Sequence, residues 1–396
     1  MRQRPSRINW IEARLPLAAW YRVGWRDHPV PANLPFAWSF AAMVAVALAV
    51  LTITGIWLGL AYTPTPQAAA LSIVIYTRTV PFGWLIEDLH RDGATMLFGV
   101  VYLDLFQGLY FATYRNRREL AWILEVVRFA VFLVIGFFGY AMTGSPASRA
   151  AMLIMAEHIA AIPLLGPTIA LDFRGGPTLG ATSLPHMAMT HIAIGFLVLL
   201  IAMLGYVASR MAPPANPDGI AGLDPRDLVP QSSYNARLFL AFIVFAVILA
   251  LIMLISPGWG YPTGPARLGP FTMRMGPLPP WYLLVFHGFA RAGITPAGGT
   301  ALTFLALGLL AALPWLDRGR VASARYRPVY GAFVILFALD LALLGYAAAQ
   351  PSRGIWPIVI DAATIWCFAH LIVVTPVVTR LEPRHIVPAR ITRRRV

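Results

Sequence analysis

Apolar residues dominate the chain in long runs, and polar residues gather in the segments between these runs. A helix of roughly 20 apolar residues is long enough to cross the ~30 Å hydrocarbon layer of a membrane. The pattern therefore predicts an all-α polytopic membrane protein in contact with lipid. Eight transmembrane helices are predicted, the sixth being the shortest, at about 37–62, 93–113, 120–142, 187–208, 237–256, 299–315, 328–348 and 356–377.

The polar segments divide the chain into two helical bundles. Residues 1–208 hold the first four predicted spans, and residues 237–383 hold the last four. Residues 209–236 between them are rich in Pro, Asp and Gly, which is typical of a linker. Residues 384–396 form a basic tail.

Three further segments carry information about organisation. The stretch INWIEARLPLAAWYRVGWRDHPVP places apolar residues at helical spacing beside charged ones, which predicts a short helix on the membrane surface. No short apolar segment with a cleavage site precedes the first span, so we expect no cleaved signal peptide. The loop SPGWGYPTGPARLGPFTMRMGPLPPWYLL is long for a connector, and long loops are often functional.

The chain has a net charge of +14, and all of its basic residues other than histidine are arginines, since it has no lysine. About 21 of the 31 basic residues lie in the two termini and in the loops near 114–119, 209–236 and 316–327, against about eight in the opposite loops. This asymmetry predicts that both termini face the cytoplasm, and we expect a multi-pass protein of the bacterial inner membrane. A nucleic-acid-binding protein would gather its arginines on one soluble face, so no nucleic acid is expected.

Two histidines stand at the start of long apolar runs in the first bundle, His90 and His191. Imidazole nitrogens from facing helices commonly bind haem iron. If the second and fourth spans are neighbours, both imidazoles lie at one depth, although interfacial histidines without a metal remain the alternative. A second haem layer would need ligands 14 residues further along, because 14 residues advance a helix by ~21 Å and return it to the same face. Those positions hold Asp104 and Gly205.

Charged residues also fall inside the predicted spans, where they are costly unless paired or functional. Glu125 and Arg128 are three residues apart and can meet on one helix, and Asp104 faces the same layer. A polar filling of the bundle and a proton or ion path are both open interpretations, as is placement in a loop. Packing or surface placement accounts for the other candidates in or near the spans, which are His158, His287, Asp340, Cys367 and His370.

Seven motifs between about residue 8 and residue 383 make the chain similar to a known family. They are INWIEARLPL, LTITGIWLGLAYTP, LHRDGATMLFGVVYLDLFQGLYFATYR, FFGY, SLPHMAMTH, PPWY and LPWLDRGRVASARYRPVY. With these motifs the chain resembles cytochrome b, the membrane core of quinol:cytochrome c oxidoreductase, the bc1 complex. The resemblance implies eight transmembrane helices, with two b haems stacked in the first four.

The resemblance implies one retained haem site and one lost site. At the outer site the family's iron ligands align with His90 and His191, and its close-approach glycines align with Gly55 and Gly139. An arginine that helps to hold this haem in the family aligns with Glu87. At the inner site no feature is kept, since ligands and glycines are replaced by Asp104, Gly205, Ala41 and Glu125.

The residues that align with the family's quinone sites also differ from those of the family. The Pro-Glu-Trp-Tyr motif reads Pro279–Tyr282 with proline at 280, and proline has no group that could accept a proton from quinol. A Pro-Trp-Gly turn is replaced by residues 143–145, and the inner-site histidine and aspartate align with Arg210 and Phe239. No catalytic residue for quinol oxidation is therefore expected, and quinone binding stays open.

These departures favour a divergent cytochrome b-like redox subunit with one outer b haem, paired with an active cytochrome b. The resemblance implies a cytochrome c1-like subunit and a Rieske iron–sulfur protein as further partners. The alternative is a haem-free structural or assembly subunit of a respiratory or photosynthetic membrane complex. A third hypothesis is a quinone- or small-molecule-binding membrane protein on the same fold.

Overall fold

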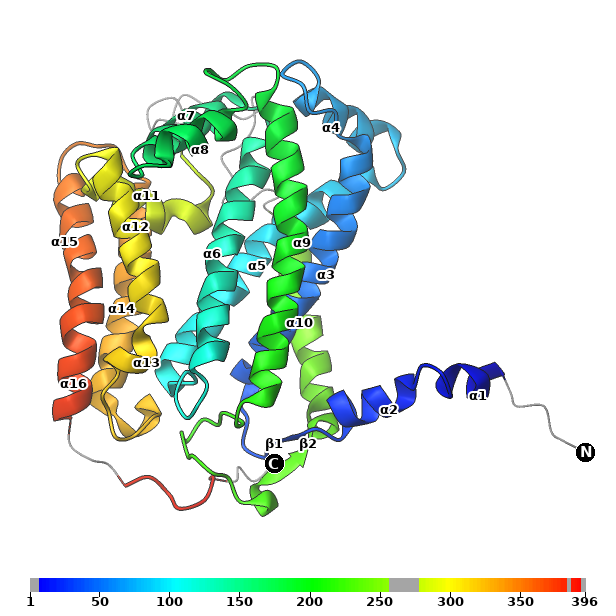
Figure 1. The fold of residues 1–396 in the computed structure, drawn as a ribbon, viewed down its shortest axis with the longest axis vertical. Helices are drawn as coiled ribbons and strands as arrows, with labels where there is room; N and C mark the ends of the chain where they lie inside the picture. The colour runs from blue at the N-terminus through cyan, green and yellow to red at the C-terminus, as the bar shows by residue number, and fades with distance from the viewer. Residues whose placement is uncertain (1–6, 256–277, 383–385, 393–396) are drawn as a thin grey trace, which may run out of the picture.

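A computed structural model describes residues 7–255, 278–382 and 386–392. The long loop predicted between the fifth and sixth spans falls mostly at 256–277, outside the described residues. The first half of the chain is built on four long helices (Figure 1), which are α3 (Phe40–Ala61), α5 (Gly83–Phe111), α6 (Glu119–Ala141) and α9 (Ser183–Met211).

These four helices form two closely packed pairs. Helix α3 packs along α5, and α6 packs along α9, whereas α5 and α6 touch each other only over a short stretch. The candidate histidines lie on α5 and α9, one in each pair. The space between the pairs is therefore where the two imidazoles can meet.

The second half of the chain packs beside α5 and α6. It comprises α10 (Asn235–Ile255), α11 (Leu284–Ala292), α12 (Pro296–Ala311), α13 (Leu313–Leu316), α14 (Pro328–Ala348), α15 (Trp356–Ala369) and α16 (Thr375–Leu381). Helix α15 continues through a π-helical turn, His370–Val374, into α16, and these three form one span.

The predicted fold class is confirmed: the chain is an all-α, multi-pass membrane protein. Among the described residues, seven helical segments are long and apolar enough to cross a membrane. The predicted sixth span corresponds to α12, which has 16 residues and is the short one. The count of eight is therefore approximate, because one crossing helix falls below the usual length.

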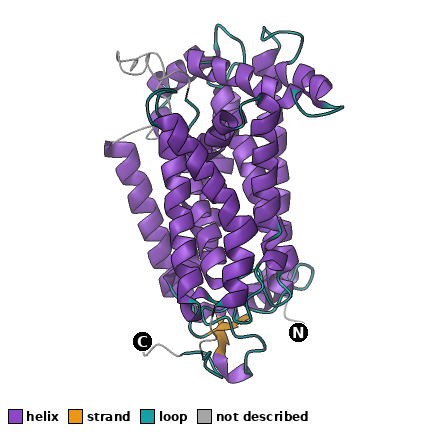
Figure 2. Cartoon of the chain, turned by 90° about the vertical axis from the view of Figure 1, so that its left-hand side faces the viewer, coloured by secondary structure: helices purple, strands orange, loops and turns teal. Residues whose placement is uncertain are grey.

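The described residues nearest to the two chain ends lie at one end of the helical bundle, which we call the terminal face (Figure 1). The short strands β1 (Pro29–Pro31) and β2 (Leu228–Pro230) pair there in antiparallel fashion, as Figure 2 shows in a second view. The opposite face carries α4 (Ala69–Thr79), α7 (Pro146–Ala160) and α8 (Gly166–Arg174).

The N-terminal helices α1 (Arg7–Glu12) and α2 (Leu17–Tyr21) project sideways from the terminal face (Figure 1). Their aromatic side chains Trp10 and Trp20 are exposed. The predicted N-terminal helix is thus present as two short pieces. Its contact with a membrane surface stays a prediction.

The predicted linker is bound to the rest of the terminal face through one buried carboxylate, Asp218. Its oxygens accept hydrogen bonds from Asn33 Nδ2 at 2.8 Å, Arg325 Nη1 at 2.7 Å and the Tyr326 hydroxyl at 3.0 Å. The backbone N–H and hydroxyl of Thr392 donate to it as well, both at 2.9 Å. Four distant parts of the chain therefore meet at this carboxylate.

The electrostatics of Asp218 follow from these contacts. Burial by itself would raise the pKa of the Asp218 carboxyl, but the hydrogen bonds from Thr392, Tyr326 and Arg325 outweigh burial and lower it. A carboxylate with a lowered pKa stabilises the fold above the pKa of the unfolded chain, ~4. That stabilisation is lost as the pH falls through the lower, folded-state pKa.

We predict that Asp218→Asn destabilises the protein at pH 7, by up to about 3–5 kcal/mol, because an amide cannot accept all of these hydrogen bonds and leaves Arg325 without its charge partner. Thermal unfolding of the detergent-solubilised protein measures the loss. Asp224→Asn is the matched control, since Asp224 lies in the same linker and its carboxylate, within the described part of the chain, accepts hydrogen bonds from the neighbouring Arg226 alone. Equal unfolding temperatures for the two variants would contradict the prediction, as would a difference that does not shrink in strong acid.

Candidate functional site

The imidazole rings of His90 on α5 and His191 on α9 face each other across the space between the two helix pairs. Their ring centroids are 6.3 Å apart, and the ring planes are inclined at 72°. The structure thus brings together the two histidines that the sequence singles out.

Hydrogen bonds at Nδ1 fix the same tautomer on both rings. Nδ1 of His191 lies 3.1 Å from the carbonyl oxygen of Ile135, which can only accept, so the proton is on Nδ1. Nδ1 of His90 lies 3.0 Å from the hydroxyl oxygen of Thr54. That hydroxyl donates to the Val50 carbonyl at 2.7 Å, so it accepts from His90. Each Nε2 therefore presents its lone pair, the state that binds a metal.

A glycine beside each ring allows this close approach. A Cβ atom at Gly55 would lie 2.8 Å from Cε1 of His90, and one at Gly139 would lie 3.1 Å from Cε1 of His191. Both distances are tighter than normal contacts between such atoms. The surroundings of the two histidines are alike, since each imidazole contacts a glycine on the helix that packs along its own helix.

The separation of the rings fits an iron atom held between them. A metal–imidazole nitrogen bond is about 2 Å long and the ring centroid lies roughly 1 Å beyond, so two imidazoles that held one metal ion between them would have centroids about 6 Å apart. The observed separation of 6.3 Å agrees with this value. The donor set, two neutral imidazoles with free Nε2 atoms, is one that haem iron takes.

The rim of the site near the start of α5 carries several charges. Arg91 follows His90 and pairs with Glu87 at 2.6 Å and with Asp88. Its guanidinium also lies 3.3 Å from the buried carboxylate of Asp92. The charge of Glu87 is therefore balanced by an arginine of its own helix.

The inner layer, 14 residues further along α5, has a different construction. Arg128 on α6 contacts the carboxylate of Glu125 and lies 3.7 Å from Oδ2 of Asp104. The predicted contact between Arg128 and a carboxylate is confirmed. On α9, a Cβ atom at Gly205 would meet only Leu124, at 4.0 Å. No imidazole faces this charged group from the two predicted ligand positions.

The segment Pro279–Tyr282 is packed inward. Pro280 precedes a short 3₁₀ turn, Trp281–Leu283. The ring of Tyr282 stacks on Phe98 with centroids 3.8 Å apart, and its hydroxyl donates to the Gly136 carbonyl at 3.3 Å. Of the two residues that the sequence resemblance aligns with the family's inner quinone site, Arg210 lies over the rings of Trp25 and Tyr206, and the Phe239 side chain is exposed.

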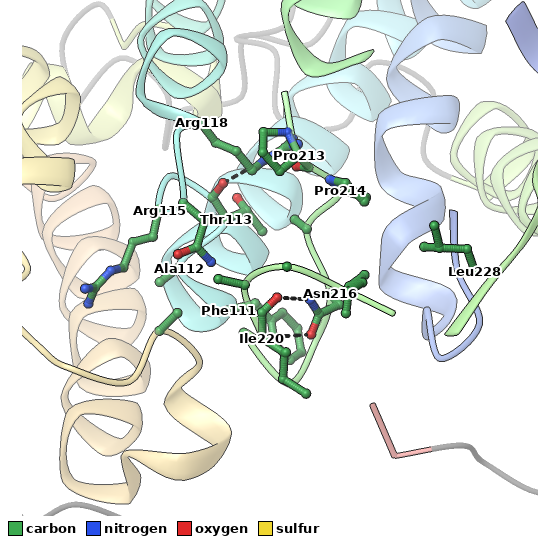
Figure 3. A pocket seen from close by; sticks show the side chains of 17 residues that line it. Phe111, Ala112, Thr113, Arg115, Arg118, Pro213, Pro214, Asn216, Ile220 and Leu228 are labelled. Atoms are coloured by element: carbon green, nitrogen blue, oxygen red, sulfur yellow. Dashed lines mark hydrogen bonds between the residues drawn. The ribbon is translucent and has the colours of Figure 1, made fainter. Parts of the chain in front are cut away.

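A separate pocket of about 140 Å³ lies at the terminal face (Figure 3). It is lined by the loop after α5 and by the linker, and Arg118 closes it by donating to the carbonyls of Thr113 at 3.0 Å and Pro213 at 2.7 Å. Asn216 Nδ2 donates to the Ile220 carbonyl at 2.8 Å on its other side. The guanidinium therefore holds the two loops together, and the amide stabilises the turn within the linker.

Two contacts at the histidine site were not predicted from the sequence. Thr54 directly precedes Gly55, so its position was a usable signal for a partner of His90. The Ile135 carbonyl is a backbone group, and no residue pattern marks it. His191, from which this carbonyl accepts a hydrogen bond, was identified from the sequence.

Comparison with known proteins agrees with this geometry. The family profile described as "Cytochrome b/b6/petB" matches residues 25–212, and "Cytochrome b(C-terminal)/b6/petD" matches residues 277–368. A cytochrome b of Rickettsia bellii is 31% identical over 95% of this chain and 94% of its own length. A cytochrome b of Rhodospirillum rubrum is 30% identical over 97% of this chain and 96% of its own.

The chain belongs to the cytochrome b family. A "Cytochrome b/c1" of Bradyrhizobium diazoefficiens is 30% identical over 97% of this chain, which spans 56% of that protein. A solved structure titled "Hyperthermophilic respiratory Complex III" has the same fold, with a TM-score of 0.82, 24% identity and coverage of 95% of this chain and 99% of that one. This is a cytochrome b of the bc1 type, and membership of the family implies that it binds haem b.

We predict that Gly55→Ala lowers the haem content of the purified cytochrome b, because the new Cβ atom pushes the His90 ring away from its position. Gly59→Ala is the matched control, since it lies one turn further along α3 and a Cβ atom there would meet nothing within 4 Å. Haem is measured per chain from the pyridine haemochrome spectrum. Equal haem content in the two variants would show that the contact with His90 does not matter.

Proposed function

We propose that this cytochrome b binds one b haem per chain, between His90 and His191, and that its inner layer holds no haem. The observation that carries the proposal is the contrast between the two layers. One layer presents two imidazoles of the same tautomer with centroids 6.3 Å apart. The other layer presents the side chains of Arg128, Glu125 and Asp104, which contact one another.

At the outer site the protein supplies ligands and orientation. A bound haem b supplies a one-electron redox centre. Thr54 and the Ile135 carbonyl hold the protons of the two rings on Nδ1, which keeps both Nε2 atoms available for iron. Gly55 and Gly139 leave room for the rings against α3 and α6.

In the inner layer the charged side chains take the place of ligands. A guanidinium has only donors, and Arg128 directs them to carboxylates. A haem-sized space without haem would leave a cavity, which is destabilising. Asp104 and Glu125 with their counter-charge fill part of that space. Without an inner redox centre, an electron has no relay across the membrane through this chain.

Quinol oxidation also lacks its proton acceptor. Pro280 has no titratable side chain, so it can take no proton. We therefore infer that this subunit does not turn over quinol by itself. Quinone binding without turnover stays open.

We infer that the subunit pairs with an active cytochrome b, alongside a cytochrome c1-like subunit and a Rieske iron–sulfur protein. The bc1-type similarity and the relative named cytochrome b/c1 support an assembly with other subunits. Because this subunit lacks the inner haem, such a heterodimer would have a single complete electron path, the one through the active cytochrome b. The arginine distribution supports a bacterial inner-membrane location with both termini in the cytoplasm.

A haem-free structural or assembly subunit is the second candidate. The loss of the inner ligands and of the quinol proton acceptor favours it, because both changes remove redox chemistry. The two candidates differ in one measurable quantity, the haem content of the chain.

We predict one haem per chain with a low-spin spectrum, as expected for two imidazole ligands. His191→Ala should remove this haem, because His90 then lacks its axial partner. The count comes from the pyridine haemochrome spectrum divided by the protein concentration. Two haems would refute the assignment of the inner layer, and none would favour the structural role.

We also predict that the isolated subunit has no quinol:cytochrome c reductase activity and that Pro280→Glu alone does not restore it. The restored carboxylate could accept a proton, but the relay through an inner haem would still be missing. Reduction of cytochrome c by quinol in detergent measures the activity. Turnover by the Pro280→Glu variant would mean that the inner layer does carry electrons.

A further inference from the structure

The contact between α14 and the span formed by α15, the π-helical turn and α16 is lined by buried polar side chains. We call this contact the α14–α15 seam. The set comprises Tyr330, Asp340, Thr364, His370 and Thr375, and every member is at least nine-tenths buried. Three of their atoms have no hydrogen-bond partner among the described residues, namely the Thr364 hydroxyl, Oδ2 of Asp340 and Nδ1 of His370.

Buried polar atoms without partners are rare in native proteins, and each one needs a physical explanation. One isolated case could be a local irregularity of packing. Three in one seam, at the depth of the membrane, indicate a shared partner that is not a side chain. Water is the usual partner of such groups, because one molecule bridges two to four polar atoms.

The polar groups are arranged in levels along the seam. The hydroxyls of Tyr330 and Thr375 face each other near the terminal face. Further in, the ring of His370 stacks on Phe337 with centroids 4.4 Å apart and planes inclined at 7°. Asp340 lies three residues beyond Phe337 on α14. Each helical turn is ~5 Å, a step that one or two water molecules can bridge.

The next level joins the two helices again. Cys367, three residues before His370, lies within electrostatic reach of Asp340. The Thr364 hydroxyl follows at about one further turn. Beyond this level the seam closes, because Leu344 is fully buried and Arg291 donates to the carbonyl of Ala348 at 2.8 Å.

At its outer end the seam is continuous with a hydrogen-bonded cluster at the terminal face. The Tyr114 hydroxyl faces Tyr330 and donates to Asp317 Oδ2 at 2.9 Å. Asp317 also accepts from Arg327 Nη1 at 2.8 Å. Burial, followed by the nearby Tyr330 and Asp317, raises the pKa of Tyr114 well above its usual range, so its hydroxyl keeps a proton that it can donate.

Asp340 is the group at the inner end that can hold a proton. No basic side chain forms an ion pair with it in the part of the chain that the structure describes. An ionised carboxylate without a partner is costly at this depth, so it needs either a proton or water. The charged or titratable groups facing the seam are Cys367 and His370 from α15 and the π-helical turn, and Arg291 from α11 at the closed end.

We propose that the α14–α15 seam holds a chain of water molecules through which Asp340 exchanges protons with the terminal face. Each hydroxyl or imidazole along the way accepts one proton and releases another, so no charge accumulates and no other reactant is needed. The passage ends near Thr364 and does not cross the membrane. The π-helical turn that begins at His370 supports the proposal, since such irregular turns are frequent at functional sites.

The test follows the carbonyl stretching band of the protonated Asp340 carboxyl by infrared spectroscopy on the full chain in lipid nanodiscs. Asp340→Asn should remove one carboxylic-acid band, which assigns it. After transfer to D₂O the band of the wild-type protein should shift promptly. His370→Phe, which keeps the stacked ring, and Thr375→Val, which keeps the shape, should slow that shift by about tenfold or more, a barrier of about 1.4 kcal/mol.

Thr303→Val on α12 is the matched control, because its hydroxyl is a half-buried membrane hydroxyl that donates to its own helix, to the Gly299 carbonyl at 3.1 Å. It should leave the shift unchanged, and unfolding temperatures verify that each variant is folded. If His370→Phe does not fold, Thr375→Val decides alone. The proposal is wrong if Asp340→Asn removes no band, if neither seam variant slows the exchange, or if Thr303→Val slows it equally. The measurement does not depend on haem.

Discussion

A membrane interior offers no water, so every polar side chain on a spanning helix must find its partner inside the protein. This constraint explains the three polar layers of the structure. His90 and His191 are held by a hydroxyl and a carbonyl. Arg128 is held by two carboxylates. At Asp340 no such side-chain partner is present among the described residues, and there the structure points to water.

The sequence was sufficient to predict the spans and the histidine pair. Apolar length sets the spans, and the 14-residue spacing separates the two layers without any structure. The start of α12 was placed too late because Gly298 and Gly299 interrupt the apolar run, whereas Pro296 and the capping hydroxyl of Thr295 begin the helix earlier. Boundaries of this kind depend on caps, and hydropathy does not detect them.

Contacts between distant segments could not be predicted from the sequence. Asp218 stands in a stretch that reads as turns, yet its carboxylate joins residues 185 positions before it and 174 after it. The same is true of Asp317, whose partner Tyr114 is 203 residues away. Short polar residues in loops look alike in a sequence. Only the fold decides which of them is buried, and burial is what makes the contact strong.

The position of α5 connects these observations. This helix carries His90 near one end and Asp104 further along, so any shift along its axis moves both layers together. Its terminal end is linked to the second half of the chain by two side chains. Tyr114, just after α5, is bonded to Asp317, and Trp122 on α6 packs against Gly108 of α5 while its Nε1 donates to the Leu310 carbonyl at 2.8 Å. The histidine pair lies within the first half of the chain. The depth at which α5 presents its imidazole is nevertheless set in part by residues of the second half, which is why the two bundles have to be considered as one structure.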